Sequence, residues 1–135
     1  MLIRGEDLGW TWAAKSNSTI AQAHSGILYV SGLVAFDADG KIVGADMAAQ
    51  SKQVFGNLRQ VLTHAGITFE QVLKINCYLS DLSQFRAFAD VRGAAFPDRL
   101  PVNTTVGAAL ALPDLLVEVE AQAFYQSDDQ GRSEG

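Results

Sequence analysis

Cysteine and histidine are scarce in this 135-residue chain. Cys77 is the only cysteine, which excludes an intrachain disulfide and a thiolate cluster for zinc or iron–sulfur. The only two histidines, His24 and His64, have no HExxH or CxxC spacing near them. We therefore expect no protein-bound metal and no cofactor. Cys77 itself is expected to be a small buried apolar residue rather than a nucleophile.

Long apolar runs and a surplus of basic residues are also lacking. No run reaches the roughly 18 apolar residues of a membrane span, and acidic residues interrupt the N-terminus where a signal peptide would be apolar. We therefore expect a cytoplasmic protein with no membrane partner. Ten Lys and Arg against 15 Asp and Glu leave a net charge of −5. Because nonspecific affinity for nucleic acid comes from basic residues, we expect no nucleic-acid partner.

The composition that is present suits one compact domain. Hydrophobic residues make up 48% of the chain and charged residues 19%, which is enough for a single core. We expect residues 1–126 to form this domain. The polar tail 127–135, SDDQGRSEG, is expected to be disordered.

The first half of the chain predicts a hairpin and one long helix. Residues 27–36 are apolar on both alternating sets, and Asp39-Gly40 supplies a tight turn before a short return strand over 41–43. The stretch around Trp10 is expected to be a short strand plus a loop. A helix follows from Asp46 as N-cap to Gly66, since apolar residues recur there at three- and four-residue steps.

The second half predicts a strand, a helix and two more strands. Residues 72–79 alternate, and the apolar face carries Leu73, Ile75, Cys77 and Leu79. The capping-box spacing of Asp81 and Gln84 starts a helix that ends before Pro97. Strands are then expected over 103–110 and 115–125. The last one places Val117, Val119, Ala121 and Ala123 on one face and Glu118, Glu120 and Gln122 on the other.

The order of these elements predicts an α/β (α+β) fold. A single sheet of about five to six strands would have two helices packed on one face. Because two helices cover only one face and the 27–36 strand is apolar on both, the other face is expected to meet another copy of the chain.

Several short motifs resemble the Rid superfamily, also called the YjgF-like or L-PSP family. A leucine-proline pair before a strand that ends in Val-Glu-Ala is the most specific of them. The matching residues are Gln22, 26–32 (GILYVSG), Gln53, Asn57-Leu58, 72–74 (VLK), 78–82 (YLSDL), Phe85, Leu112-Pro113 and 117–123 (VEVEAQA).

The resemblance implies a fold like that of chorismate mutase and a homotrimer with clefts between its subunits. It also implies, for the deaminating branch, hydrolysis of imines and enamines to ketones plus ammonia. In that branch an arginine grips the substrate carboxylate, and its position holds Asn103 here. The glutamate near the end of the last strand is matched by Glu120. A tyrosine and an asparagine of that branch are replaced by Ile20 and Ala89.

The site residues follow from this comparison and from the residue types. Glu120 is the catalytic candidate, which would orient an attacking water, although a surface or structurally paired carboxylate is an equally simple interpretation. The substrate-binding candidates are Asn103 and Thr105 as neutral hydrogen-bonding groups, Gly32 as a point of close approach, Arg99 as a substitute cation, and Ile20. For Arg99, an ordinary solvated loop arginine is the alternative.

Three functions remain open from the sequence. The first is a trimer that binds a small metabolite between its subunits and hydrolyses an imine or enamine. The second is a non-catalytic trimer that binds a small molecule or a protein, which the missing arginine, tyrosine and asparagine favour. A ribonuclease or translation inhibitor is the third, and the acidic balance and the lack of a histidine pair weigh against it.

Overall fold

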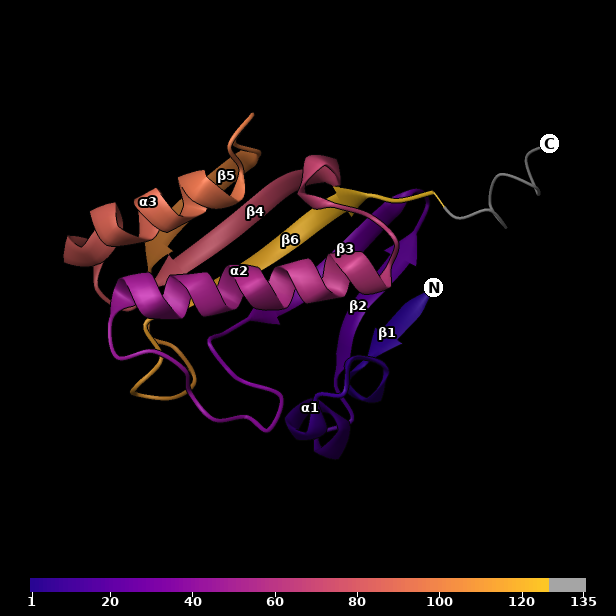
Figure 1. Cartoon of the computed structure of the whole chain (residues 1–135), viewed down its shortest axis with the longest axis horizontal. Helices are drawn as coiled ribbons and strands as arrows, with labels where there is room; N and C mark the ends of the chain where they lie inside the picture. Colours follow the sequence, from indigo (N-terminus) through magenta and orange to yellow (C-terminus); the bar gives the residue numbers. More distant parts are fainter. Residues whose placement is uncertain (127–135) are drawn as a thin grey trace.

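A six-stranded sheet forms the centre of the computed structural model, which describes residues 1–126 (Figure 1). The strands lie in the order β1-β2-β3-β6-β4-β5. In this part of the chain β4 and β5 are parallel, and every other neighbouring pair is antiparallel. The tail 127–135 that we expect to be disordered lies outside the described residues. The strands are β1 (Leu2–Arg4), β2 (Thr19–His24), β3 (Ile27–Leu33), β4 (Val72–Leu79), β5 (Val102–Gly107) and β6 (Val117–Phe124).

Two of the helices cover one face of this sheet. They are α2 (Met47–His64) and α3 (Phe85–Ala95), which pack together through Phe55 and Phe88 with ring centroids 6.1 Å apart. Figure 1 shows α2 crossing the sheet and α3 lying along β5. The predicted N-cap is confirmed, because the Asp46 carboxylate accepts a 2.8 Å hydrogen bond from the backbone N–H of Ala49. The predicted α+β class is therefore confirmed.

The N-terminal region differs from the expected short strand plus loop. After β1 comes a 3-10 turn at Gly5–Leu8, and residues Thr11–Lys15 form the short helix α1. Trp10, only 4% exposed, anchors this segment, and its indole Nε1 donates to Oε1 of Gln60 on α2. The helix is thus held by tertiary contacts that no local pattern revealed. Two more 3-10 turns lie at Phe69–Gln71 and Leu82–Gln84.

The last strand has the two faces that its alternation predicts. Val117, Val119, Ala121 and Ala123 are at most 4% exposed, and they form the core beneath the helices. Glu118, Glu120 and Gln122 point to the opposite side of the sheet, which no helix of residues 1–126 covers. We call this side the open face and the other side the helical face.

The hairpin predicted after residues 27–36 is present in a shorter form. β3 ends at Leu33, but the chain turns at Gly40 with positive φ, an antiparallel bridge joins Phe36 to Ile42, and the N–H of Val43 donates to the carbonyl of Ala35. The pairing stays short because side-chain amides also use these backbone acceptors: Nδ2 of Asn57 donates 2.9 Å hydrogen bonds to the carbonyls of Val34 and Phe36. A longer hairpin joins β2 to β3 through the positive-φ pair at residues 25 and 26.

One residue of β4, Leu73, lies on the opposite face of the strand from the one predicted. The pairing of β4 with β6 shifts between Val72 and Lys74, so Val72 is buried while Leu73 is 43% exposed. A bulge of this kind breaks strict alternation without a sequence signal. Ile75, Cys77 and Leu79 are buried as predicted. The next strand, β5, ends at Gly107 rather than at residue 110.

Candidate functional site

A cavity of about 330 Å³ lies on the open face where four strands meet. Glu120 is one of the residues that line it. Strands β2, β3, β6 and β4 line it through residues 19–22, 29–31, 120–122, Lys74 and Asn76. Small ligands typically bind in a cavity of this size in which a small number of polar groups converge.

Glu120 is fixed in this cavity by two donors. The Tyr78 hydroxyl donates to Oε1 of Glu120 at 2.6 Å, and Nδ2 of Asn76 donates to the same oxygen at 3.2 Å. Asn76 is paired directly with Glu120 in the antiparallel ladder, and Tyr78 follows two residues later on the same face. Both bonds reach Oε1, so Oε2 accepts no hydrogen bond from residues 1–126. That oxygen remains available to a water molecule or a ligand.

A second carboxyl group lies beside the first on the open face. Burial raises the pKa of Glu118, and the negative charge of Glu120 raises it further. The hydrogen bond to Glu120 likewise raises the pKa of the Tyr78 hydroxyl, with smaller contributions from burial and from the charges of both carboxylates. Glu118 therefore holds its proton to a higher pH than an ordinary glutamate, while the two hydrogen bonds to its Oε1 position Glu120 as an acceptor.

The sequence predicts close approach of a ligand or a neighbouring subunit at Gly32, and in the structure the Glu118 side chain of the same chain lies there. A Cβ atom at position 32 would overlap the Glu118 carboxylate. The absence of a side chain at Gly32 thus lets Glu118 lie flat against β3. Ile20, only 1% exposed, belongs to the hydrophobic core, although it is among the residues that line the cavity. The structure therefore brings Gly32 and Glu120 together on the open face, while Ile20 is buried next to the irregularity in the pairing of β1 with β2.

Asn103 and Thr105 lie on the helical face instead. Their neighbours in the parallel ladder are Ile75 and Cys77, both fully buried under the helices. Within one chain, the sheet itself therefore separates them from Glu120. The Asn103 amide is already engaged on both sides: Oδ1 accepts from Nη1 of Arg92 at 3.1 Å, and Nδ2 donates to the carbonyl of Pro101 at 2.9 Å.

Arg92 of α3 is the cation that comes closest to Asn103. Its Nη1 also donates to Oγ1 of Thr105 at 3.4 Å, and its guanidinium lies 5.5 and 5.4 Å from the ring centroids of Phe85 and Phe88. Such cation–π contacts contribute about 0.5–2 kcal/mol. The sequence signal that could have identified Arg92 is its position four residues after Phe88, on the core-facing side of α3.

Arg99, the cation considered from the sequence, lies elsewhere. It is exposed in the loop after α3 and lines a separate cavity of about 290 Å³ beside Phe69 and Phe96. No hydrogen bond joins it to Asn103 or Glu120 in the described part of the chain. Tyr78 and Asn76 were also missed, because only the register of β4 against β6 brings them to Glu120.

Cys77 and the remaining residues offer no second reactive centre among residues 1–126. Burial raises the pKa of the Cys77 thiol to about 11, although a hydrogen bond with Thr105 and the charge of Arg92 act against the rise. The thiol is therefore protonated at neutral pH, and its burial is as predicted. Within the same range, no three His, Cys, Asp or Glu side chains gather as metal ligands, and no helix is long and apolar enough to cross a membrane.

Comparison with known proteins identifies the family. The model of the family described as Endoribonuclease L-PSP matches residues 12–125. A RutC family protein of Pyrococcus abyssi is 32% identical over 100 residues, covering 73% of this chain and 79% of that protein. The mitochondrial protein MMF1 of Saccharomyces cerevisiae is 32% identical over 112 residues, covering 81% and 76% respectively.

Solved structures agree with this result. A Mycobacterium tuberculosis member of the YjgF/YER057c/UK114 family superposes with a TM-score of 0.73 at 29% identity, covering 84% of this chain and 91% of that chain. RidA from an Antarctic Psychrobacter species gives a TM-score of 0.74 at 28% identity, covering 79% and 87%. The matched segment extends from α1 to the end of β6 and includes all four strands that line the cavity. The chain therefore belongs to the Rid (YjgF-like, L-PSP) superfamily.

Proposed function

We propose that this protein is a homotrimer that binds a small metabolite in clefts between its subunits, and that Glu120 hydrolyses an imine or enamine there. The observation that carries the proposal is the arrangement of Glu120. Two donors fix Oε1, while Oε2 has no protein partner among residues 1–126, and the residue lines a cavity of about 330 Å³. A carboxylate held in this way can orient and deprotonate a water molecule.

The reaction that this geometry supports is the addition of water to a carbon–nitrogen double bond. Oε2 of Glu120 takes a proton from water as the oxygen attacks the imine carbon. As the oxygen adds, the nitrogen takes one proton from Glu118, which gives the neutral carbinolamine. Glu120 then returns its proton to the nitrogen, the carbon–nitrogen bond breaks, and the hydroxyl proton passes back to Glu118, so that a carbonyl compound and ammonia are formed. An enamine first accepts a proton on carbon to become the imine. Glu118, whose pKa is raised by burial and by the charge of Glu120, is the group that we assign as the donor of this proton.

The trimer is supported by apolar groups on the open face. Tyr29 is 47% exposed, and Val102 and Val106 of the edge strand are 69% and 42% exposed. Val102 and Val106 pair with Lys74 and Tyr78, so they share the face of Glu120. A cyclic assembly would cover these groups.

A non-catalytic ligand-binding trimer is the second candidate. The observation in its favour is that both ends of the Asn103 amide are already hydrogen-bonded, so Asn103 itself offers little to a substrate. A ribonuclease is less well supported, because the net charge of −5 opposes binding of a polyanion. We also propose a cytoplasmic location, which differs from that of the yeast relatives named as mitochondrial.

Ammonia release separates the first two candidates. Freshly generated 2-aminoacrylate and a bulkier imine would each be mixed with the protein, and ammonia would be followed against an equal mass of an inert protein. The Glu120→Gln variant keeps the size of the side chain and an acceptor for Tyr78, but it cannot take a proton. We expect it to lose roughly 100-fold in rate. No release above the inert protein would refute the enzymatic function.

A further inference from the structure

We propose that the cavity beside Phe69 and Phe96 binds a small organic ammonium ion, that is, a protonated amine with a compact apolar body. This cavity has a volume of about 290 Å³. It lies where α3 ends and the turn at Phe69–Gln71 begins, and Figure 1 shows both at the same end of the sheet. None of its lining residues lines the cavity of Glu120, so the inference goes beyond the proposed function and does not depend on it. The lining includes Phe69, Glu70, Phe96, Pro97, Asp98 and Arg99.

Two aromatic rings form the apolar part of the cavity. The rings of Phe69 and Phe96 meet edge to face, with centroids 5.2 Å apart and an interplanar angle of 83°. The faces of aromatic rings carry partial negative charge and attract cations. Phe69 already holds one cation in this way, since the Arg59 guanidinium lies 4.7 Å from its centroid, and Arg59 lines a different cavity, beside Leu8. The rings therefore favour a positively charged ligand over a neutral one of the same shape.

The end of α3 adds negative charge at the same place. The last four carbonyls of a helix have no intrahelical partner, and they form the negative end of the helix dipole. The N–H of Phe96 donates to the carbonyl of Arg92, but Pro97 has no N–H with which to continue the pattern. The carbonyls of residues 93–95 accept no backbone hydrogen bond from residues 1–126. Because residues 95–99 line the cavity, the negative end of the dipole adjoins it.

Two carboxylates at the rim supply full negative charges. Glu70 and Asp98 are exposed, and neither takes part in the one ion pair among residues 1–126, which joins Arg86 to Asp90. Arg99 is the one cation in the lining, so two carboxylates against one guanidinium leave a net charge of −1 there. A ligand with a single positive charge is complementary to this lining.

The cavity is held in shape before a ligand arrives. A capping box fixes the turn at Phe69–Gln71, because the hydroxyl and the N–H of Thr68 both donate to Oε1 of Gln71, at 2.8 and 2.9 Å. On the other side, Phe96 is only 7% exposed and packs edge to face against Phe55 of α2. The walls therefore lose little freedom on binding, which favours affinity. The volume is close to the lower end of the roughly 300–1,000 Å³ of small-ligand cavities, so a ligand with one ring suits it.

A titration followed by NMR at fixed, low ionic strength would test both the place of binding and the preference for charge. Benzylamine is the cationic probe, benzyl alcohol is its neutral counterpart, and phenylacetate is an anion of similar size. The backbone amide shifts of Glu70, Asp98 and Arg99 report on this cavity. Those of Lys74 and Asn76 report on the cavity of Glu120.

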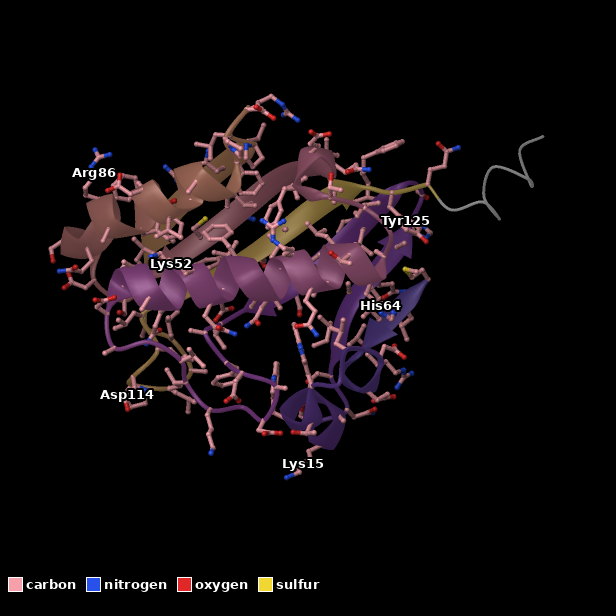
Figure 2. The ribbon with its side chains drawn as sticks, in the orientation of Figure 1. Lys15, Lys52, His64, Arg86, Asp114 and Tyr125 are labelled. Atoms are coloured by element: carbon pink, nitrogen blue, oxygen red, sulfur yellow. The ribbon has the colours of Figure 1, made fainter. Side chains whose placement is uncertain are left out.

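The variants remove one rim charge at a time, from side chains that are exposed and do not hold the fold. They are Glu70→Gln, Asp98→Asn and Arg99→Gln. The matched controls are Asp90→Asn and Arg86→Gln, which remove one charge of each sign from α3 without touching the lining. Figure 2 shows that Arg86 extends into solvent at the far end of the molecule from the C-terminal end of β6.

We expect benzylamine to bind roughly tenfold more tightly than benzyl alcohol, and phenylacetate to bind most weakly. Glu70→Gln and Asp98→Asn should each weaken benzylamine binding by roughly threefold, and Arg99→Gln should strengthen it by a similar factor. Both control variants should bind benzylamine as the unchanged protein does. Equal affinity for the three probes, tightest binding of phenylacetate, shifts confined to Lys74 and Asn76, or no binding of benzylamine would each overturn the inference.

Discussion

The Tyr78 hydroxyl donates a 2.6 Å hydrogen bond to Oε1 of Glu120, across the ladder between β4 and β6. The bond fixes the orientation of the carboxylate in the cavity, and Asn76 shares the same acceptor oxygen. Glu120 of β6 is thus held by two side chains of β4, which lie 44 and 42 residues earlier in the sequence. Its position depends on the sheet register and not on any local turn.

Replacing Tyr78 by Phe should therefore reduce the rate of imine hydrolysis while leaving the fold intact. Without the hydroxyl, Glu120 keeps only its bond to Asn76 and samples more orientations, so we expect a loss of roughly tenfold in kcat. Steady-state kinetics, with circular dichroism as the check on folding, would measure it. A variant that is as active as the unchanged protein would mean that Tyr78 does not position the carboxylate.

The pH dependence of stability should carry the signature of Glu118. Its pKa is raised in the folded state, so folding favours the protonated form. That contribution is fully present below the unfolded value of about 4.3 and is lost as the pH rises through the folded pKa. The contribution of Glu118 to the melting temperature should therefore fall as the pH rises above about 4.3. In the Glu118→Gln variant this decrease should be absent, so its curve of melting temperature against pH should be flatter there. Parallel curves for both proteins would contradict the burial of this carboxyl.

An alanine at position 32 should destabilise the protein through one contact. The new Cβ would overlap the Glu118 carboxylate, which must then move away from β3. Since the carboxylate is the flexible end of a side chain, we expect a loss of about 1 kcal/mol in the free energy of unfolding. Urea denaturation of Gly32→Ala, Glu118→Ala and the double variant would form a double-mutant cycle. The cost at position 32 should largely vanish when Glu118 is absent, and a fully additive cycle would refute the contact.

The thiol of Cys77 should be unreactive in the native protein. It is fully buried, and burial raises its pKa to about 11, so neither access nor thiolate is available at neutral pH. Ellman's reagent should titrate no thiol in buffer and one per chain in concentrated denaturant. Rapid labelling under native conditions would show that β4 opens or that the helical face is not closed over Cys77.

Light scattering should give three times the chain mass of 14.5 kDa. The exposed Tyr29, Val102 and Val106 on the open face supply the apolar surface for such an assembly. Replacing Val102, the most exposed of the three, by Lys should weaken it. A stable monomer of the unchanged protein at micromolar concentration would exclude clefts between subunits.

Much of the fold could be predicted because it depends on local periodicity. The α2 helix follows from three- and four-residue steps after the Asp46 cap, and the two faces of β6 follow from alternation. The family was also recognisable, since its motifs lie in short continuous stretches such as 117–123. These features depend on residues that are close together in the sequence, so the sequence by itself determined them.

The site could be predicted only in part, because tertiary pairing decides it. Alternation places Glu120 on one face of β6, but only the register with β4 brings Tyr78 and Asn76 to it. Likewise, the parallel pairing of β5 with β4 turns Asn103 to the helical face and toward Arg92, 11 residues earlier on α3. The sequence determined which side chains each strand and helix presents. Which of them meet was decided by strand register and helix packing, because these depend on contacts between segments that are distant in the chain.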